Sequence, residues 1–337
     1  MSDNKYQFDP NKPLMVGGQA VIEGVMMRGP GRIATAVRRS NGTIVVKKKE
    51  YVSLAEKYPI FRLPILRGAV GLIEMMFVGI ETLNFSAEVA MHDIEEKERA
   101  NGNGKAKKEK KSASNLKIGL TVAFSLLVGV GIFFFTPLIV TTKLFNIEQS
   151  AFLFNVVAGV IRIGILLGYL SAISLMKDVQ RLFRYHGAEH KAVFTFESRA
   201  DLTPESAAHY TRFHPRCGTS FILIVMVTSI LLFAVIDSLL ILWLGQISLP
   251  VRLLTDIPFI PLVGGAAYEF IRWSAKRSTT FVGKMLVAPG LWLQRITTKE
   301  PDHGMLEVAV VALKCALRME EPEGVAYIES ASELVAG

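Results

Sequence analysis

The chain has 337 residues, of which 50% are hydrophobic and 20% charged, and its mean hydropathy is +0.36. Soluble domains carry about 25% charged residues, so this composition excludes an ordinary soluble globular protein. The apolar residues gather in runs that reach the roughly 20 residues a helix needs to cross a bilayer. We therefore expect a mainly α-helical, multi-pass integral membrane protein.

The charge and cysteine content exclude two further classes. The net charge is +8, from 38 Lys and Arg against 30 Asp and Glu. Basic residues collect on the cytoplasmic flanks of membrane helices, and the chain has no DNA- or RNA-binding motif, so we expect no nucleic-acid partner. Cys217 and Cys315 lie far apart and predict no disulfide framework. The polar first 13 residues lack an apolar core and predict no cleavable signal peptide.

Residues 14–58 predict a small cytosolic β unit. Two β-prone runs, 33–39 and 43–52, flank the dipeptide Asn-Gly at 41–42. This dipeptide favours a two-residue type I′ hairpin turn, because both turn residues need a positive φ. Residues 20–27 are a candidate third strand. The glycines of the unit match no phosphate-binding loop, so we interpret them as turn residues.

The segment 60–91 is apolar except for charged residues that recur every seven positions. On a helix, residues at this spacing form one slowly drifting polar stripe. Such a helix is either amphipathic and interfacial or embedded in a bundle with its stripe facing a wet cavity. Residues 92–115, rich in Lys, Gly and Asn, predict a mobile charged linker. The stripe consists of Arg67, Glu74, Glu81 and Glu88.

Residues 116–273 predict a membrane domain with a cytosolic loop at 177–218. Seven Lys and Arg residues lie in that loop, whereas the connections 141–152 and 246–252 hold one each. By the positive-inside rule, the loop and both termini face the cytoplasm of a plasma membrane. We expect the C-terminal region 274–337 to be cytosolic or interfacial. The four expected spans are 116–140, 153–176, 219–245 and 253–273.

Charged residues interrupt these spans, and such residues are functional suspects by default. Arg162 and Asp237 are a candidate pair between the second and third spans, and Glu269 and Arg272 are one within the fourth. The fourth span also has two prolines and a Gly-Gly pair near Asp256, like the broken helices of transporters. A transporter is therefore one alternative function.

Four of the six histidines and one of the two cysteines lie between residues 186 and 217. In His186-x-x-Glu189-His190 the two imidazoles stand at i and i+4, so on a helix they share a face and can hold one metal ion. His214-x-x-Cys217 offers further ligands from a tight turn. Glu189 is the candidate general base for an attacking water, as in inverted zincins.

The expected cofactor is a divalent metal, in the first place Zn²⁺, which His and Cys side chains commonly bind. Four protein ligands would close the tetrahedron and indicate a structural site, whereas three plus a water would indicate a catalytic one. The alternative without a metal is an interfacial helix whose histidines bind lipid phosphates or carboxylates.

Five motifs occur in order within residues 14–318. Together they resemble the bacterial YqhQ family, multi-pass membrane proteins of unknown function that are described as predicted metal-dependent enzymes. The resemblance implies that Gln19, Glu23, Glu88 and the His, Glu and Cys residues above lie in family motif blocks. The motifs are GGQAVIEGVMMRG (17–29), LNFSAE (83–88), YHGAEHK (185–191), HPRCGTSF (214–221) and PGLWLQRITTKEPD (289–302).

The sequence thus favours a cytosol-facing, membrane-embedded metal-dependent enzyme, in the first place a hydrolase, with a membrane-associated substrate or protein partner. Its metal ligands would be His186, His190, His214 and Cys217, and Glu189 would be the general base. The other alternative is a membrane scaffold with a structural metal site. Candidates for orienting a ligand or contacting substrate are Gln19, Glu23, Glu74, Glu81 and Glu88.

Overall fold

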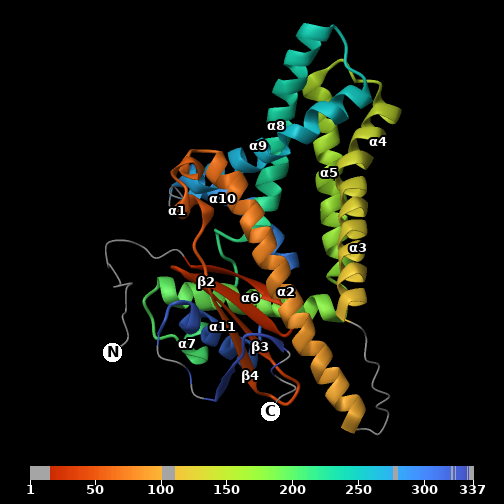
Figure 1. The fold of residues 1–337 in the computed structure, drawn as a ribbon. Coiled ribbons are helices and arrows are strands. Elements are labelled where there is room, and N and C mark those ends of the chain that lie inside the picture. The colour runs from red at the N-terminus through yellow and green to blue at the C-terminus, as the bar shows by residue number, and fades with distance from the viewer. Residues whose placement is uncertain are drawn as a thin grey trace.

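The computed structural model describes residues 16–100, 111–275 and 280–319, and beyond them residues 322, 324–331 and 333. A small sheet with helices on both faces forms the lower part of the molecule, and a bundle of long apolar helices rises above it (Figure 1). The expected predominance of helices, combined with a small N-terminal β unit, is confirmed.

The β unit has more strands than the sequence predicts, because five strands form one sheet in the order β1-β2-β3-β4-β5. The first four are antiparallel neighbours, and a three-residue C-terminal strand lies parallel to β4. A strand of that length carries too little periodicity to be found in a sequence. The strands are β1 (Gly17–Val21), β2 (Gly24–Gly29), β3 (Arg32–Arg38), β4 (Ile44–Glu50) and β5 (Val325–Tyr327).

The hairpin predicted from residues 33–39 and 43–52 is confirmed as β3 and β4, but its turn has a different geometry. Of the Asn-Gly pair, Gly42 alone has a positive φ, of 91°, and its amide donates to the Arg39 carbonyl at 3.0 Å. The connection is therefore a three-residue loop closed by a left-handed glycine, and not a type I′ turn.

The candidate third strand at 20–27 is wrong in extent, because the chain reverses inside it. Val21 pairs with Gly24, and Ile22 and Glu23 form the two-residue turn between β1 and β2. Glu23 has a φ of 53°, a left-handed conformation that is uncommon for a residue with a side chain. The apolar residues on both sides of this turn look like one β-prone run in the sequence.

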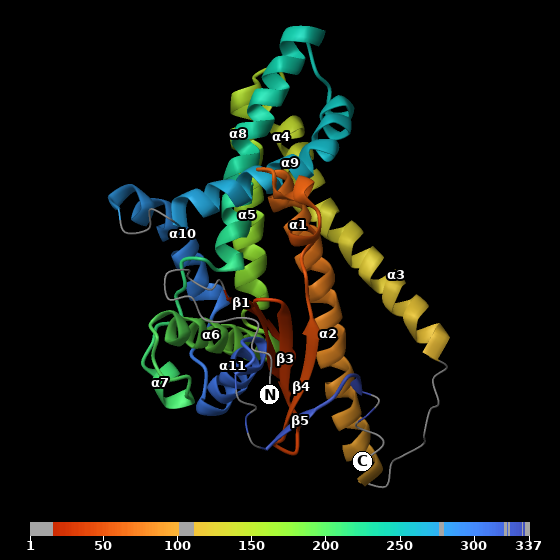
Figure 2. The ribbon, with the colours of Figure 1, turned by 60° about the vertical axis from the view of Figure 1, so that its left-hand side comes forward.

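The sheet is buried on both faces, between two helices on one side and a single long helix on the other (Figure 2). Alternate residues of a strand point to opposite faces. Val25 and Met27 therefore pack with α6 and α11, whereas Met26 packs with Phe85 of α2. The covering helices are α2 (Leu66–Ala100), α6 (Lys177–Glu197) and α11 (His303–Ala316), and the short α7 (Pro204–Ala208) packs against α6 and α11.

The helix expected at 60–91 is the longer α2, which runs from the side of the bundle down past the sheet (Figure 1). Its 35 residues make it about 52 Å long. Two charged residues of its stripe bind separate partners, because Arg67 pairs with Glu269 and Glu81 pairs with Lys49. Two short elements, α1 (Leu54–Lys57) and η1 (Pro59–Arg62), connect the sheet to α2.

Of the predicted linker at 92–115, residues 92–100 continue α2 and residues 111–115 begin the next helix. Residues 101–110 lie outside the described part of the chain. The extension of α2 follows from its contacts, because Arg39 of the β3–β4 connection donates to Asp93 at 2.8 Å and stabilises the last turns.

Four helices are long and apolar enough to cross a membrane, and they agree with the expected spans to within a few residues: Gly119–Phe145, Ala151–Ile173, Gly218–Leu244 and Leu249–Ser274. The first contains a short π-helical stretch, and the last contains two prolines. The elements are α3 (Lys111–Val130), η2 (Gly131–Phe135), α4 (Thr136–Phe145), α5 (Ala151–Ile173), α8 (Gly218–Leu244), α9 (Leu249–Ala275) and α10 (Phe281–Thr297).

The charge pairs predicted within the spans are wrong. Asp237 accepts from Arg252 at 2.5 Å and from Asn155 at 2.6 Å. Arg162 instead donates to the Phe133 carbonyl at 2.9 Å. That carbonyl belongs to η2, and a π-helical stretch leaves backbone carbonyls without their usual α-helical partners.

The pair predicted between Glu269 and Arg272 is also wrong, since Glu269 binds Arg67 of α2. At the same contact, Gly68 of α2 lies against Gly265 and Tyr268 of α9, and a Cβ on Gly68 would come within 3.0 Å of the Gly265 Cα. The small residues let the two backbones approach closely. The Gly-Gly pair of the fourth span is thereby explained by packing.

Candidate metal centre

The two histidines of the His-x-x-Glu-His motif lie on α6, at the boundary between the sheet and the bundle. His190 is buried and His186 is half-buried. Gly187, between them, allows the chain that follows α10 to pass close to α6, because a Cβ there would lie 2.1 Å from the Lys299 carbonyl oxygen. The Lys299 amide in turn donates to the Phe183 carbonyl at 2.8 Å. The end of α10 is thus fixed against the histidines.

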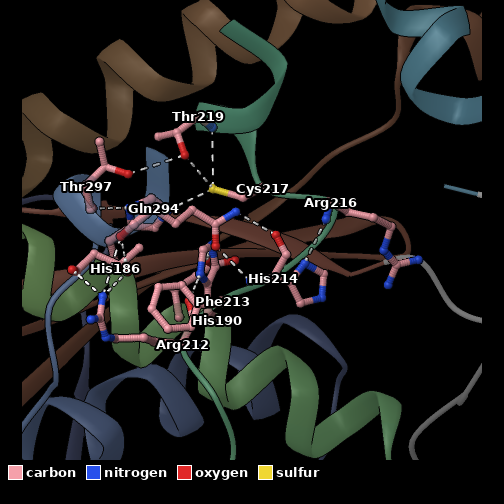
Figure 3. Close-up of polar contacts among 12 residues, drawn as sticks. His186, His190, Arg212, Phe213, His214, Arg216, Cys217, Thr219, Gln294 and Thr297 are labelled. Carbon is pink, nitrogen blue, oxygen red and sulfur yellow. Dashed lines mark hydrogen bonds and ion pairs between the residues drawn. The ribbon is translucent and has the colours of Figure 1, made fainter. Parts of the chain in front are cut away.

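Cys217 lies next to the two histidines, although it stands at the other end of the loop 177–218. It is the residue before α8, and its sulfur lies 3.2 Å from His186 Nε2. One ligand atom from each of His186, His190 and Cys217 lies within 4.8 Å of the other two (Figure 3). Zn–N bonds of about 2.0 Å and Zn–S bonds of about 2.3 Å place tetrahedral ligand atoms roughly 3.3–3.5 Å apart. Small side-chain shifts would therefore close the three ligands, which we call the triad, around one ion.

The other ring nitrogen of each triad histidine is held by a backbone carbonyl. His186 Nδ1 lies 2.9 Å from the Thr297 carbonyl oxygen, and His190 Nδ1 lies 2.5 Å from that of Arg212. A carbonyl only accepts, so Nδ1 carries the proton in both rings and the Nε2 lone pair is free for a metal. Histidine ligands of metal sites are oriented in this way. The donor set fits Zn²⁺.

His214, predicted as a ligand, lies outside the triad. Its ring is 5.6 Å from the His190 ring, but both of its nitrogens are engaged elsewhere. Nδ1 accepts from the Arg216 amide at 3.2 Å, and Nε2 lies 3.4 Å from the Glu197 carboxylate. The structure therefore brings three of the four predicted ligands together, and His214 instead shapes the turn that leads to Cys217.

Gln294 of α10 fixes that turn and was missed by the sequence analysis. Its amide accepts from the His214 amide at 2.8 Å and donates to the His214 carbonyl at 2.7 Å (Figure 3). The side chain is fully buried, and buried polar groups are nearly always paired. The available signal was a single amide on the apolar face of a helix, within the motif at 289–302.

Glu189 lies beside the triad in a buried position, with Oε2 3.5 Å from His190 Nε2. Burial raises the pKa of this carboxyl above its ordinary value, against the opposite effects of His186, His214 and the Gly18 amide. Burial also lowers the pKa of His190, which keeps its imidazole neutral and able to bind a metal. A cavity of about 100 Å³ lies among the triad, Glu189 and the first residues of β1.

The remaining sequence candidates are engaged at other places. Gln19 donates to Thr82 of α2 at 3.0 Å, and Glu23 pairs with Arg181. The other three, Glu74, Glu81 and Glu88, lie on α2, which covers the opposite face of the sheet from α6. The structure therefore does not bring these five residues together with the triad.

A second group with ligand-forming side chains, His92, Asp93 and Glu96, lies on α2. Asp93 already accepts from Arg39 at 2.8 Å and from the Ser40 amide at 2.5 Å, and Arg39 also donates to Glu96 at 2.7 Å. Because the guanidinium occupies the place a cation would take, we interpret this group as an ion-pair network that holds α2 to the β3–β4 hairpin.

Comparison with known proteins identifies the family. The model of a protein family of unknown function, DUF1385, matches residues 63–319. The chain belongs to this family. It is 32% identical over 322 residues to the uncharacterized protein YqhQ of Bacillus subtilis (strain 168). The aligned region covers 91% of this chain and 94% of that relative. The resemblance expected from the motifs is thereby confirmed, and no solved structure gives a significant match.

Proposed function

We propose that this DUF1385 protein is a membrane-embedded, cytosol-facing, metal-dependent hydrolase. The observation that carries the proposal is the triad with its locked imidazoles, next to the buried carboxyl of Glu189 and an adjoining cavity. Three protein ligands leave one tetrahedral position open, which is typical of catalytic rather than structural zinc sites.

The chain's own residues have separate roles in this proposal. A divalent cation held by the triad would act as a Lewis acid on water or on a substrate carbonyl. Glu189 takes a proton from the attacking water and returns it to the leaving group, and burial raises the pKa of its carboxyl above the ordinary value. Cys217 is the N-cap residue of α8, and its sulfur is the third ligand of the triad.

The packing of the sheet supports one common orientation of the chain in the membrane. Strands β2 to β4, α6 and α11 share one core, so all of them lie on one side of the membrane. Two candidate spans separate the sheet from α6, and two more separate α6 from α11. This even number fits a shared cytoplasmic side, which the seven Lys and Arg residues of the 177–218 loop favour.

Metal analysis of the full-length protein, purified in detergent without chelators, tests the proposal. We expect about one zinc per chain in wild type and in Glu189→Gln, and much less in His186→Ala and Cys217→Ser. The matched control is His209→Ala, since His209 is exposed and lies outside the triad. Wild-type protein with less than about 0.2 metal per chain, after dialysis against Zn²⁺, would contradict the proposal.

A cellular assay separates an enzyme from a scaffold with a structural site. If the protein is a hydrolase, Glu189→Gln keeps the metal and the protein level but fails to complement a deletion strain. If the metal is structural, Glu189→Gln complements, whereas Cys217→Ser lowers the protein level because the site no longer holds the loop to α6.

A further inference from the structure

The free edge of the sheet lies at the proposed metal site. β1 is an edge strand, and Gly17 and Gly18 line the cavity beside the triad. Val21 pairs with Gly24 across the two-residue turn. The two residues that close such a turn each donate a backbone hydrogen bond to the other. Along the antiparallel ladder, hydrogen-bonded pairs of residues then alternate with pairs that are not hydrogen-bonded. Val21, Gln19 and Gly17 therefore turn their backbone groups toward β2, whereas Gly18 turns its own toward the open edge.

Among the residues that the structure describes, no further strand pairs with this edge. The first two residues of β1 are exposed glycines, and the strand GGQAV contains no charged residue, proline or bulge. Among the described residues, no main-chain group outside the ladder bonds to Gly17 or Gly18, and the Gly18 amide faces the carboxylate of Glu189. Proteins normally have charged residues, prolines or bulges in an exposed edge strand, because an edge strand without them can pair with another extended chain. Here the open edge coincides with the site that we propose to be catalytic.

The fit around Gly18 is close on the side of Glu189. A Cβ on Gly18 would lie 3.0 Å from Glu189 Cγ and 2.3 Å from the Met26 carbonyl oxygen. A glycine therefore lets the strand run directly beside the candidate base. Gly17, by contrast, has open space around the position of a Cβ.

We propose that the substrate of this site is an extended peptide segment that adds to the free edge of β1. The inference rests on the proposed function, and it names the substrate class of the same site. Strand addition supplies main-chain hydrogen bonds that do not depend on the peptide's sequence. A peptide aligned with Gly18 presents its own carbonyl groups to the cavity that the triad and Glu189 share.

The reaction is the hydrolysis of one peptide bond. The oxygen of a water molecule bonds to the carbonyl carbon, the C–N bond breaks, and Glu189 carries a proton from the water to the leaving nitrogen. The products are a carboxylic acid and an amine, the acid gives its proton to the amine to form a carboxylate and an ammonium group, and water is the only other reactant.

The cavity favours a peptide over a lipid. Its volume is about 100 Å³, and apart from Val16, Val193 and three glycines it is lined by His, Glu, Arg and Cys side chains. An acyl chain needs a long apolar groove, whereas a peptide backbone needs donors and acceptors in a row. The edge of β1 provides that row.

The first experiment identifies cleavage. Full-length, zinc-loaded protein in detergent is incubated with a peptide library made from a digested proteome, and new termini are found by mass spectrometry. We expect cleavage by wild type and by Glu88→Gln, whose carboxyl is exposed on α2, and none by Glu189→Gln. Phosphatidylglycerol vesicles and a p-nitrophenyl ester are assayed in parallel.

The second experiment tests strand pairing through binding and needs no turnover. The best-cleaved peptide is remade with a single backbone N-methyl group at each successive position, and its binding to Glu189→Gln is measured by fluorescence anisotropy. Only every second amide of an added strand faces β1. We therefore expect N-methylation to weaken binding about tenfold at alternate positions and by less than about twofold at the positions between them.

The outcomes distinguish this inference from the proposed function. Cleavage of peptides without the alternating pattern overturns the pairing on β1 and leaves the hydrolase in place. Hydrolysis of the vesicles or the ester alone, lost in Glu189→Gln, overturns the peptide as substrate. If the zinc-loaded protein hydrolyses none of the three probes, the inference and the proposed function both fail.

Discussion

The chemistry of the candidate site depends on which side each imidazole presents to its centre. Spacing in the sequence places His186 and His190 on one face of a helix, because residues four apart are neighbours there. It does not say that both Nδ1 atoms are held by carbonyl groups of Thr297 and Arg212, which follow the two histidines by 111 and 22 residues. The sequence therefore predicts the pair of histidines, and only the structure shows that their Nε2 atoms face the Cys217 sulfur.

At the residue scale, the orientation of the His214 side chain could not be predicted from the motif. His-x-x-Cys spacing is compatible with two ligands, because a tight turn brings the two side chains near each other. Which of them faces the centre depends on the turn itself, and here the Arg216 amide and the Glu197 carboxylate hold the His214 ring. Gln294, which fixes the turn, is 80 residues away in the sequence.

Paired asparagine variants test whether His214 is a ligand. His214→Asn keeps an acceptor for the Arg216 amide, so we expect the zinc content to stay within about twofold of wild type. His190→Asn removes a ligand, and we expect its affinity for zinc to fall at least about 100-fold. Zinc competition with a fluorescent chelator measures both variants. Equal losses of affinity in the two would show that His214 is a ligand.

At the scale of elements, length and hydropathy were sufficient to find the four apolar helices, since a helix that crosses a bilayer needs about 20 apolar residues whatever it contacts. The partners of their charged residues were not predictable, because they depend on how each helix is rotated in the bundle. Asp237 thus pairs with Arg252 rather than with Arg162. The C-terminal strand β5 was not predicted, because it is defined by its pairing with β4 and not by a pattern in its own three residues.

The close passage of the chain over α6 predicts the effect of one added methyl group. Gly187→Ala would place a Cβ 2.1 Å from the Lys299 carbonyl oxygen, so the segment after α10 must move and take the Thr297 carbonyl with it. We expect a fall in thermal stability together with at least about a tenfold loss of zinc affinity. The matched control is Gly71→Ala, whose Cβ meets nothing within 4 Å in α2 and which we expect to be neutral or stabilising by up to about 1 kcal/mol. Similar behaviour of the two variants would contradict the packing argument.

The ion pair inside the bundle predicts a non-additive pair of substitutions. Arg252 and Asp237 are each about 1% exposed and lie 2.5 Å apart. Removing one partner leaves a buried charge without compensation, which costs about 3–5 kcal/mol. We therefore expect Arg252→Met to lower the unfolding temperature in detergent more than the double variant Arg252→Met/Asp237→Asn does. The control is Arg272→Met, because Arg272 is exposed, and a strictly additive double variant would contradict the pairing.

At the scale of the whole molecule, three distant parts of the chain assemble into one body. The N-terminal strands, α6 and α11 share a core although candidate spans separate them in the sequence. Composition predicted the spans, but not that the β unit and the histidine loop form one unit. That unit has a core formed by segments more than 100 residues apart, to which Met27 of β2 and Tyr185 of α6 both belong. It explains how an open strand edge comes to lie beside the triad.

The shared core makes the topology testable with reporter fusions. If the sheet and α6 lie in the cytoplasm, the connection between α4 and α5 and the connection between α8 and α9 both lie outside. Alkaline phosphatase inserted after Glu148 or after Gln246 should then be active, because it folds only outside the cytoplasm, and the same insertion after Arg199, in the turn that follows α6, should be inactive. Green fluorescent protein inserted at the three places should give the opposite pattern, with fluorescence only after Arg199. Active phosphatase after Arg199 would place the triad outside the cell, where Cys217 faces oxidation, and would contradict the cytosolic site.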